Sequence, residues 1–138
     1  TFSPEIQLLN IHQLDDMLKW FIDFSDGDWG NAIKVSWMAQ VWYPRICNYD
    51  IAPTDWKRSV ADKLSRSVDN FKKYNQISTF YQNQIENLRA DPMPKDQKNN
   101  HQSSFMRYND TQDKHRGKTT WRQLLPDLEK AIEKNLNQ

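Results

Sequence analysis

Apolar residues near the N-terminus recur with the 3.6-residue period of an α-helix. Over residues 14–22, five apolar side chains fall at helical spacing: Leu14, Met17, Leu18, Phe21 and Ile22. This spacing places them in one stripe along a helix. Asp15 and Asp16 lie in the first turn, where carboxylates interact favourably with the positive end of the helix dipole. The pattern therefore predicts an amphipathic helix that packs its apolar stripe against the rest of the fold.

The pattern changes to strict alternation over residues 33–43, which predicts a β-strand. One face mixes polar side chains with Trp42 and a methionine, and the other carries only apolar ones: Ile33, Val35, Trp37, Ala39, Val41 and Tyr43. Pro44 ends the strand because it has no amide proton to donate. A strand needs partners, and the candidates are weaker segments at residues 5–11 and 47–52. We therefore expect a small or incomplete sheet.

Helical spacing of apolar residues returns after the strand. It extends over residues 54–73, where Thr54 is the predicted N-terminal cap, and again over residues 77–88. The two segments are separated by Asn75 and Gln76, which interrupt or bend the helical pattern. We therefore expect two consecutive helices in the middle of the chain.

The C-terminal third begins with a segment of different composition. Residues 91–103 are polar, contain prolines and show no apolar period, so they predict a mobile polar linker. A helix is expected next over residues 104–116, ended by Gly117 at a position that favours left-handed backbone. Thr120 begins a Thr-x-x-Gln capping box, which predicts a last helix that Pro126 interrupts or restarts.

The fold class that these elements predict is α+β and predominantly helical. One clear strand, at about residues 33–43, lies in a small or incomplete sheet, which could be the end of a partial (βα) barrel. A length of 138 residues suits one domain. The sequence begins at Thr1 rather than at a methionine, so we expect residues 1–138 to be either a single domain or the C-terminal fragment of a longer chain.

Composition and charge narrow the classes of function. Lys and Arg number 19 and Asp and Glu 18, so a net charge of +1 creates no overall field that attracts nucleic acid or a membrane surface. The single cysteine, Cys47, excludes an intrachain disulfide and a multi-cysteine metal site within this chain. No apolar run approaches the ~20 residues of a membrane-spanning helix, and no leader opens the sequence. We expect a cytoplasmic protein without membrane contact.

Two pairs of residues are candidates for ligand binding. Asp113 and Arg116 are three residues apart, so on a helix they form an ion pair that either anchors the helix or binds an anionic ligand. A solvated helix face is the favoured interpretation, because runs of charge are usually solvated. Trp42 and Arg45 close the predicted strand, where ligands gather in α/β folds; alternatively, Trp42 packs beneath the next helix. The histidines lack the spacing of a metal site, and the chain contains no glycine-rich phosphate-binding motif and no G-x-S-x-G nucleophile motif. We therefore predict no catalytic residue and no metal ligand.

The order of these segments resembles the C-terminal part of twitch-type radical S-adenosylmethionine proteins of tailed phages and marine metagenomes. The likeness covers about residues 10–132 and includes the strand end Val41-Trp42-Tyr43-Pro44. It also includes a terminal block made of Phe105-Met106-Arg107-Tyr108, Asp113-Lys114-His115-Arg116 and Leu125-Pro126-Asp127-Leu128. The resemblance implies that this chain supplies the last strand and the C-terminal helices of a partial (βα) barrel and shapes the substrate side of the site.

The chain departs from this family in three places. The family's Cys-x-x-x-Cys-x-x-Cys motif, whose thiolates hold a [4Fe–4S] cluster, is absent, and Cys47 alone cannot replace it. Ala52-Pro53 stands where Leu-Pro is expected, and Asp127 where Glu is usual. The resemblance therefore implies no cofactor within this chain, and S-adenosylmethionine with a [4Fe–4S] cluster only if a missing N-terminal part exists.

Two functions are open at this point. The chain is either the part of a radical S-adenosylmethionine enzyme that does not bind the cluster, or a small helical protein-interaction module without catalytic activity. Under either hypothesis we expect a homo-oligomer or a protein partner. The reason is that an open sheet face carrying Trp37 or Trp42 favours association.

Overall fold

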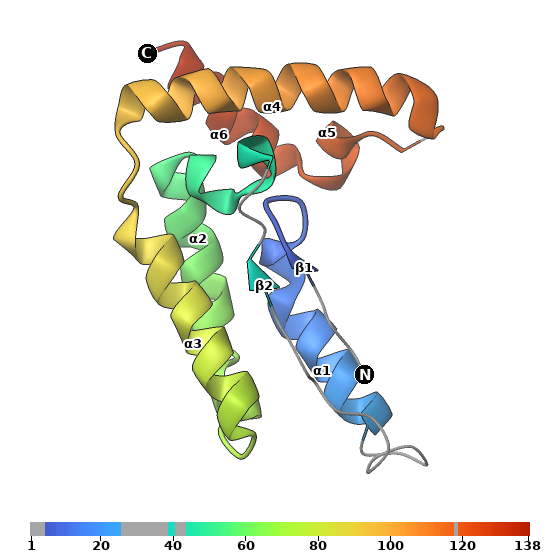
Figure 1. The fold of residues 1–138 in the computed structure, drawn as a ribbon, viewed down its shortest axis with the longest axis vertical. Helices are drawn as coiled ribbons and strands as arrows, with labels where there is room; N and C mark the ends of the chain where they lie inside the picture. The colour runs from blue at the N-terminus through green and yellow to red at the C-terminus, as the bar shows by residue number, and fades with distance from the viewer. Residues whose placement is uncertain (1–4, 26–38, 41–43, 118) are drawn as a thin grey trace.

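Helices dominate the computed structural model of the chain, which describes residues 5–25, 39–40, 44–117 and 119–138 (Figure 1). Within these ranges the α-helices, strands and 3-10 turns (η) follow in the order β1 (Glu5–Ile6), η1 (Ile11–Gln13), α1 (Leu14–Ser25), β2 (Ala39–Gln40), η2 (Arg45–Cys47), η3 (Tyr49–Ile51), α2 (Thr54–Ser65), η4 (Val68–Phe71), α3 (Asn75–Ala90), α4 (Lys95–Arg116), α5 (Trp121–Leu124) and α6 (Pro126–Leu136). None of the helices in these ranges has the length and apolar character needed to cross a membrane. The predominantly helical fold class is confirmed.

The strands β1 and β2 form a parallel pair, with α1 between them in sequence. Parallel neighbours need a crossover connection, so β1, α1 and β2 together make a β-α-β unit. Of the strand predicted at residues 33–43, the structure describes the two residues of β2, and the rest lies outside the described residues. Among the described residues the sheet has two strands, so the fold is confirmed as helical with a small sheet, and a partial barrel is not seen there.

Of the two segments predicted to partner the main strand, one is confirmed and one is wrong. The segment at residues 5–11 contributes β1, whereas residues 47–52 fold mainly into the 3-10 turns η2 and η3. The difference arises at Asn48, whose side-chain Oδ1 accepts a hydrogen bond from the Asp50 amide at 2.9 Å. Such a side-chain turn competes with strand pairing for the backbone amide.

The apolar stripe predicted for the first helix is confirmed in α1. Leu14 and Leu18 are fully buried, and Phe21 and Ile22 are at most 9% exposed. The next two helices, α2 and α3, lie side by side and run in opposite directions (Figure 1). The predicted helix at residues 54–73 is shorter than expected, since α2 ends at Ser65 and η4 follows.

The helix α4 corrects the prediction of a mobile linker at residues 91–103. Residues 95–103 are the first turns of this helix, which crosses one end of the molecule above α5 and α6 (Figure 1). The prediction failed because the buried positions of these turns are polar: Lys98 is 5% and Gln102 0% exposed. Gln102 donates its Nε2 hydrogen to the Ile51 carbonyl at 2.7 Å. A polar helix face docked in this way leaves no apolar period to detect.

The predicted end signals of the C-terminal helices are confirmed. Gly117 ends α4 with φ of 104°, a conformation that glycine adopts without strain. Thr120 caps α5: its Oγ1 accepts from the Gln123 amide at 3.2 Å, while Gln123 Oε1 accepts from the Thr120 amide at 3.0 Å. Pro126 then occupies the start of α6, where its missing amide proton costs nothing.

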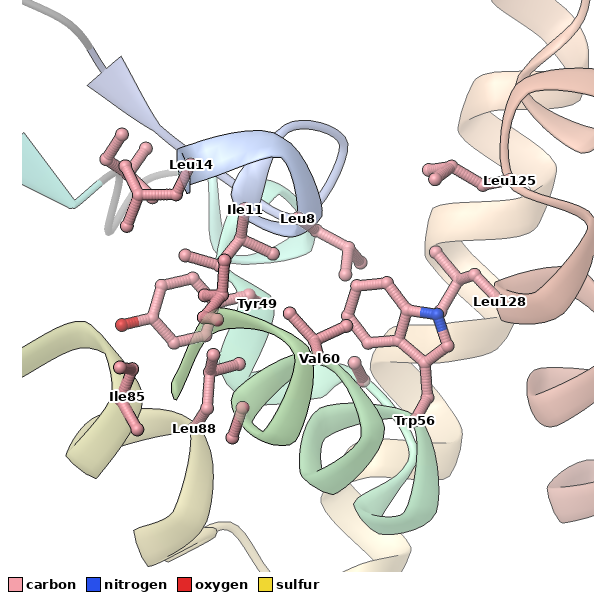
Figure 2. Close-up of a cluster of buried hydrophobic side chains, with 14 of the residues drawn as sticks. Leu8, Ile11, Leu14, Tyr49, Trp56, Val60, Ile85, Leu88, Leu125 and Leu128 are labelled. Carbon is pink, nitrogen blue, oxygen red and sulfur yellow. The ribbon is translucent and has the colours of Figure 1, made fainter. Parts of the chain in front are cut away.

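The core joins side chains from both ends of the chain (Figure 2). Val60 of α2 lies between two groups, with Tyr49 and Leu88 on one side and Trp56 and Leu128 on the other. Each of these side chains is at most 7% exposed. Because Val60 lies between the two groups and α2 contacts both α3 and α6, α2 is the element against which these two helices are positioned.

Candidate functional site

The predicted pair Trp42 and Arg45 is described only at Arg45, since Trp42 lies outside the described residues. Arg45 begins η2, which packs against α4, the helix that carries the other two predicted residues. Burial raises the pKa of Asp50, and the charges of Lys57 and Arg45 oppose that rise. Arg45 therefore compensates a buried carboxyl group of its own chain. Ligand binding by this pair stays a prediction.

Asp113 and Arg116 lie together on the last turns of α4, as their spacing predicts. Arg116 Nη1 is 3.7 Å from Asp113 Oδ1, and Asp113 Oδ2 accepts a hydrogen bond from the Trp121 amide at 2.9 Å. The carboxyl group is nearly buried, whereas the Arg116 side chain is 45% exposed. Asp113 thus pairs one of the free amides at the start of α5. This is the anchoring role that the spacing allows, and ligand binding stays a prediction.

A second arginine, Arg122, joins three helices in what we name the Arg122 clasp (Asp110, Trp121, Arg122 and Glu129). Its Nε and Nη2 donate to the two carboxylate oxygens of Asp110 at 3.0 and 2.8 Å, and its Nη1 donates to Glu129 Oε1 at 2.8 Å. The guanidinium carbon lies 5.0 Å from the centroid of the Trp121 ring. These hydrogen bonds lower the pKa of Asp110. Sequence spacing gave no signal for the clasp, because only the fold brings α5 onto α4.

Four side chains form a buried charge cluster (Thr54, Lys57, Asp91 and Lys98) where α2 meets the junction of α3 and α4. Both ammonium groups form ion pairs with Asp91 Oδ1. Thr54 Oγ1 donates to Asp91 Oδ2 and accepts from Lys98 Nζ, the latter at 2.9 Å. The Lys57 side chain is 0% and the Lys98 side chain 6% exposed. Thr54, the predicted helix cap, therefore binds a distant carboxylate instead, and Pro53 precedes the helix.

Opposing effects set the ionisation of this cluster. Burial raises the pKa of Asp91, but hydrogen bonds from Lys57, Lys98 and Thr54 outweigh it and lower the value to about 2. Burial lowers the pKa of Lys57, and the hydrogen bond with Asp91 opposes that change. Asp91 also has left-handed backbone, with φ of 44° and ψ of 56°. Since this conformation costs a non-glycine residue about 1–2 kcal/mol, the ion pairs hold a strained helix junction in place.

One sequence signal could have revealed this cluster. Lys57 falls on the buried stripe of α2, at helical spacing from Val60, Ala61 and Leu64. A lysine on an apolar stripe needs a counter-ion, because an unpaired buried charge is costly. The sequence does not identify Asp91 as that counter-ion, since the two residues are on different helices.

A pocket of about 250 Å³ opens between α2 and the α5–α6 segment, and we name it the α2–α6 pocket. Its apolar walls are buried side chains that Figure 2 shows converging from the two segments: Trp56, Val60, Leu125 and Leu128. Its polar edge is made by His12, Ser59, Lys63 and Asp127. Leu124 also lines the pocket, and it is 67% exposed. An apolar hollow with a few polar groups at its edge is typical of a binding site.

The charges at the edge of this pocket are partly neutralised within the chain. Lys63 Nζ donates to the His12 carbonyl and lies 3.3 Å from Asp15 Oδ1. Burial, followed by the charge of Lys63, lowers the pKa of His12 from 6.5. The imidazole is therefore neutral at pH 7. The pocket can thus accept an apolar group, with Lys63 and Asp127 offering one charge of each sign beside it.

The side chains that could hold a metal ion or a cluster are known for the described part of the chain. Within the described ranges, no group of three or more His, Cys, Asp and Glu side chains could hold a metal ion. Cys47 is the single cysteine of the chain, and burial raises the pKa of its thiol. A [4Fe–4S] cluster takes thiolates from several cysteines. Cys47 alone therefore cannot hold such a cluster, and the thiolates of one would have to come from a part outside this sequence.

Comparison with known proteins adds no family to this description. No family model matches the chain, and neither curated proteins nor solved structures gave a match.

Proposed function

We propose that this chain is a small, predominantly helical protein-interaction module that binds an apolar side chain of its partner in the α2–α6 pocket. The observation that carries the proposal is the pocket itself, which combines buried apolar walls with Leu124, 67% exposed at its edge. Apolar surface that gathers around a hollow is typical of protein-binding sites. Binding energy at such sites is concentrated in a few side chains that fill pockets.

The way the pocket is held supports this proposal. The α2 wall is fixed by the buried charge cluster, because Lys57 lies directly beside Trp56 on the same helix. The opposite wall is fixed by the Arg122 clasp, which ties α5 and α6 to α4. A pocket with walls held by ion pairs is preformed, and preformed sites lose less conformational entropy when they bind.

Selection of peptides from a displayed random library on the purified chain tests the proposal. The affinity of enriched peptides is then measured for the wild type, for Ser59→Trp and for Arg58→Trp. Ser59 is exposed and lines the pocket, whereas Arg58 is the neighbouring exposed residue and does not. Filling the pocket with the Ser59→Trp indole should weaken binding at least about tenfold, and Arg58→Trp should leave it unchanged. Equal affinities for all three proteins would refute the pocket as the binding site.

We propose as a second candidate that the chain closes the substrate side of a partial barrel in a radical S-adenosylmethionine enzyme. The β-α-β unit of β1, α1 and β2 supports it, since such units with parallel strands build (βα) barrels. The coding sequence upstream of Thr1 should then contain the three-cysteine motif, and the full-length product should contain iron and sulfide. An initiating methionine codon immediately before Thr1 would refute this candidate.

A further inference from the structure

The α2–α6 pocket and an exposed leucine lie next to each other on one face of the molecule. Leu124 is the last residue of α5, lines the pocket and is 67% exposed. The neighbouring apolar walls are buried, with Trp56 7%, Leu125 5% and Leu128 0% exposed. A projecting side chain beside a hollow makes the surface complementary in shape to a second copy of itself. A twofold axis close to Leu124 brings each leucine to the other copy's pocket.

The edge of the pocket is complementary to itself in charge as well. Lys63 of α2 lines one side, and Asp127 in the first turn of α6 lines the other. The Lys63 ammonium group contacts the His12 carbonyl and Asp15, and with the side chain 39% exposed it remains accessible to a further carboxylate. The same twofold axis brings Lys63 of one copy toward Asp127 of the other, and it makes this pair twice. A surface with one charge of each sign around an apolar centre is therefore complementary in charge to a second copy of itself.

We propose that the α2–α6 pocket is the interface of a symmetric homodimer, in which Leu124 of each copy enters the pocket of the other. This inference rests on the proposed function, because it takes the same pocket as a protein-binding site and names a second copy of the chain as its occupant. The pocket volume of about 250 Å³ accommodates one leucine side chain. Both pockets of the pair are filled at once, so every contact is made twice.

Sedimentation equilibrium of the full chain over a concentration series tests the dimer. The wild type should show a reversible monomer–dimer equilibrium. Leu124→Asp should raise the dimer dissociation constant about a hundredfold, since each of the two copies loses about tenfold or more when one buried leucine is removed. Phe24→Asp is the matched control, because Phe24 is an exposed apolar residue of α1 that does not line the pocket. It should leave the constant unchanged.

Exchange of the two charges tests the pairing across the twofold axis. Asp127→Lys and Lys63→Glu should each dimerise more weakly than the wild type, because each places like charges opposite one another. When the two variants are mixed, they should form a heterodimer in which both charge pairs are attractive. Its dissociation constant should be near that of the wild-type dimer. Circular dichroism of Lys63→Glu checks its fold, since Lys63 also contacts Asp15.

Several outcomes would overturn the dimer. The first is a wild type that stays monomeric over the concentration series. The second is a dimer dissociation constant of Leu124→Asp that equals that of the wild type, or a stronger effect of Phe24→Asp than of Leu124→Asp. The third is a pair of folded charge variants that do not associate when mixed. If Lys63→Glu does not fold, the dissociation constants of the Leu124→Asp and Phe24→Asp variants test the dimer without it. A monomer that still binds selected peptides in its pocket overturns the dimer and leaves the interaction function standing. A chain that binds neither overturns both.

Discussion

Replacing Asp91 with asparagine should destabilise the fold more than any exposed Asp-to-Asn change. The substitution keeps the size of the side chain, and asparagine tolerates left-handed backbone as well as aspartate does. The change therefore isolates the negative charge. Without it, the ammonium groups of Lys57 and Lys98 remain together in an almost water-free site. We expect the free energy of unfolding to fall for this electrostatic reason.

The size of this effect follows from the burial of the two lysines and from the lowered pKa of Asp91. Removing one member of a buried ion pair costs about 3–5 kcal/mol, because the other charge stays buried without a partner. The pKa of Asp91, lowered from 3.8 to about 2, corresponds to about 2 kcal/mol of stabilisation of the ionised carboxylate. We therefore expect Asp91→Asn to lower the free energy of unfolding by about 2–5 kcal/mol at pH 7. This is a large part of the ~5–15 kcal/mol that stabilises an ordinary domain.

Urea denaturation followed by circular dichroism measures this difference directly. Asp69→Asn is the matched control, since Asp69 pairs with Lys72 on the surface with its side chain 82% exposed, and exposed pairs contribute little. A lowered carboxyl pKa stabilises the fold above the unfolded-state value, and the contribution is lost as pH falls through the folded-state value. The difference in the free energy of unfolding between the wild type and Asp91→Asn should therefore decrease as the pH falls from 4 to 2. A gap below about 1 kcal/mol at pH 7, or one independent of pH, would refute the reasoning.

Three further predictions concern the C-terminal half. Arg122→Lys should lower the free energy of unfolding by about 1–2 kcal/mol in urea denaturation, because lysine cannot form the two-pronged contact with Asp110. Asp113→Ala should lower the free energy of unfolding by about 1–3 kcal/mol in the same assay, because it leaves a buried amide unpaired. Arg116→Ala should have little effect, and an equal decrease for both variants would contradict the anchoring role of Asp113. Amide hydrogen exchange at residues 95–103 should be slow, as in a docked helix. Rapid exchange would instead indicate the mobile linker that the sequence predicts for this segment.

The sequence predicted the elements that bury apolar side chains. The stripe of α1 was readable because Leu14 and Leu18 are both apolar and both fully buried. The start of α4 has no such stripe, because Lys98 and Gln102 occupy its buried positions. Their burial is made possible by Asp91 and the Ile51 carbonyl, which belong to other elements. A pattern read along one helix cannot include partners that only the fold supplies.

The same distinction applies to the residues of the candidate site. The spacing of Asp113 and Arg116 was enough to predict their contact, because both residues belong to one helix. The α2–α6 pocket was not predictable, since its walls come from helices that are distant in sequence. The partner of Lys57 was equally hidden, although a lysine on an apolar stripe indicates that a partner exists. Sequence patterns therefore predict contacts within an element and miss sites made between elements.

The helix α2 connects the two features that matter most for the proposed function. Lys57 on this helix contacts the charge cluster, while Trp56 and Ser59, close to it in sequence, line the pocket. A helix held at Lys57 by ion pairs cannot shift easily to fill a hollow that its neighbouring residues line. In the proposed function the charge cluster therefore has a second role besides stabilising the fold, because it holds the α2 wall of the pocket in place for the partner's side chain. Loss of Asp91 should accordingly weaken binding in the pocket even where the chain remains folded.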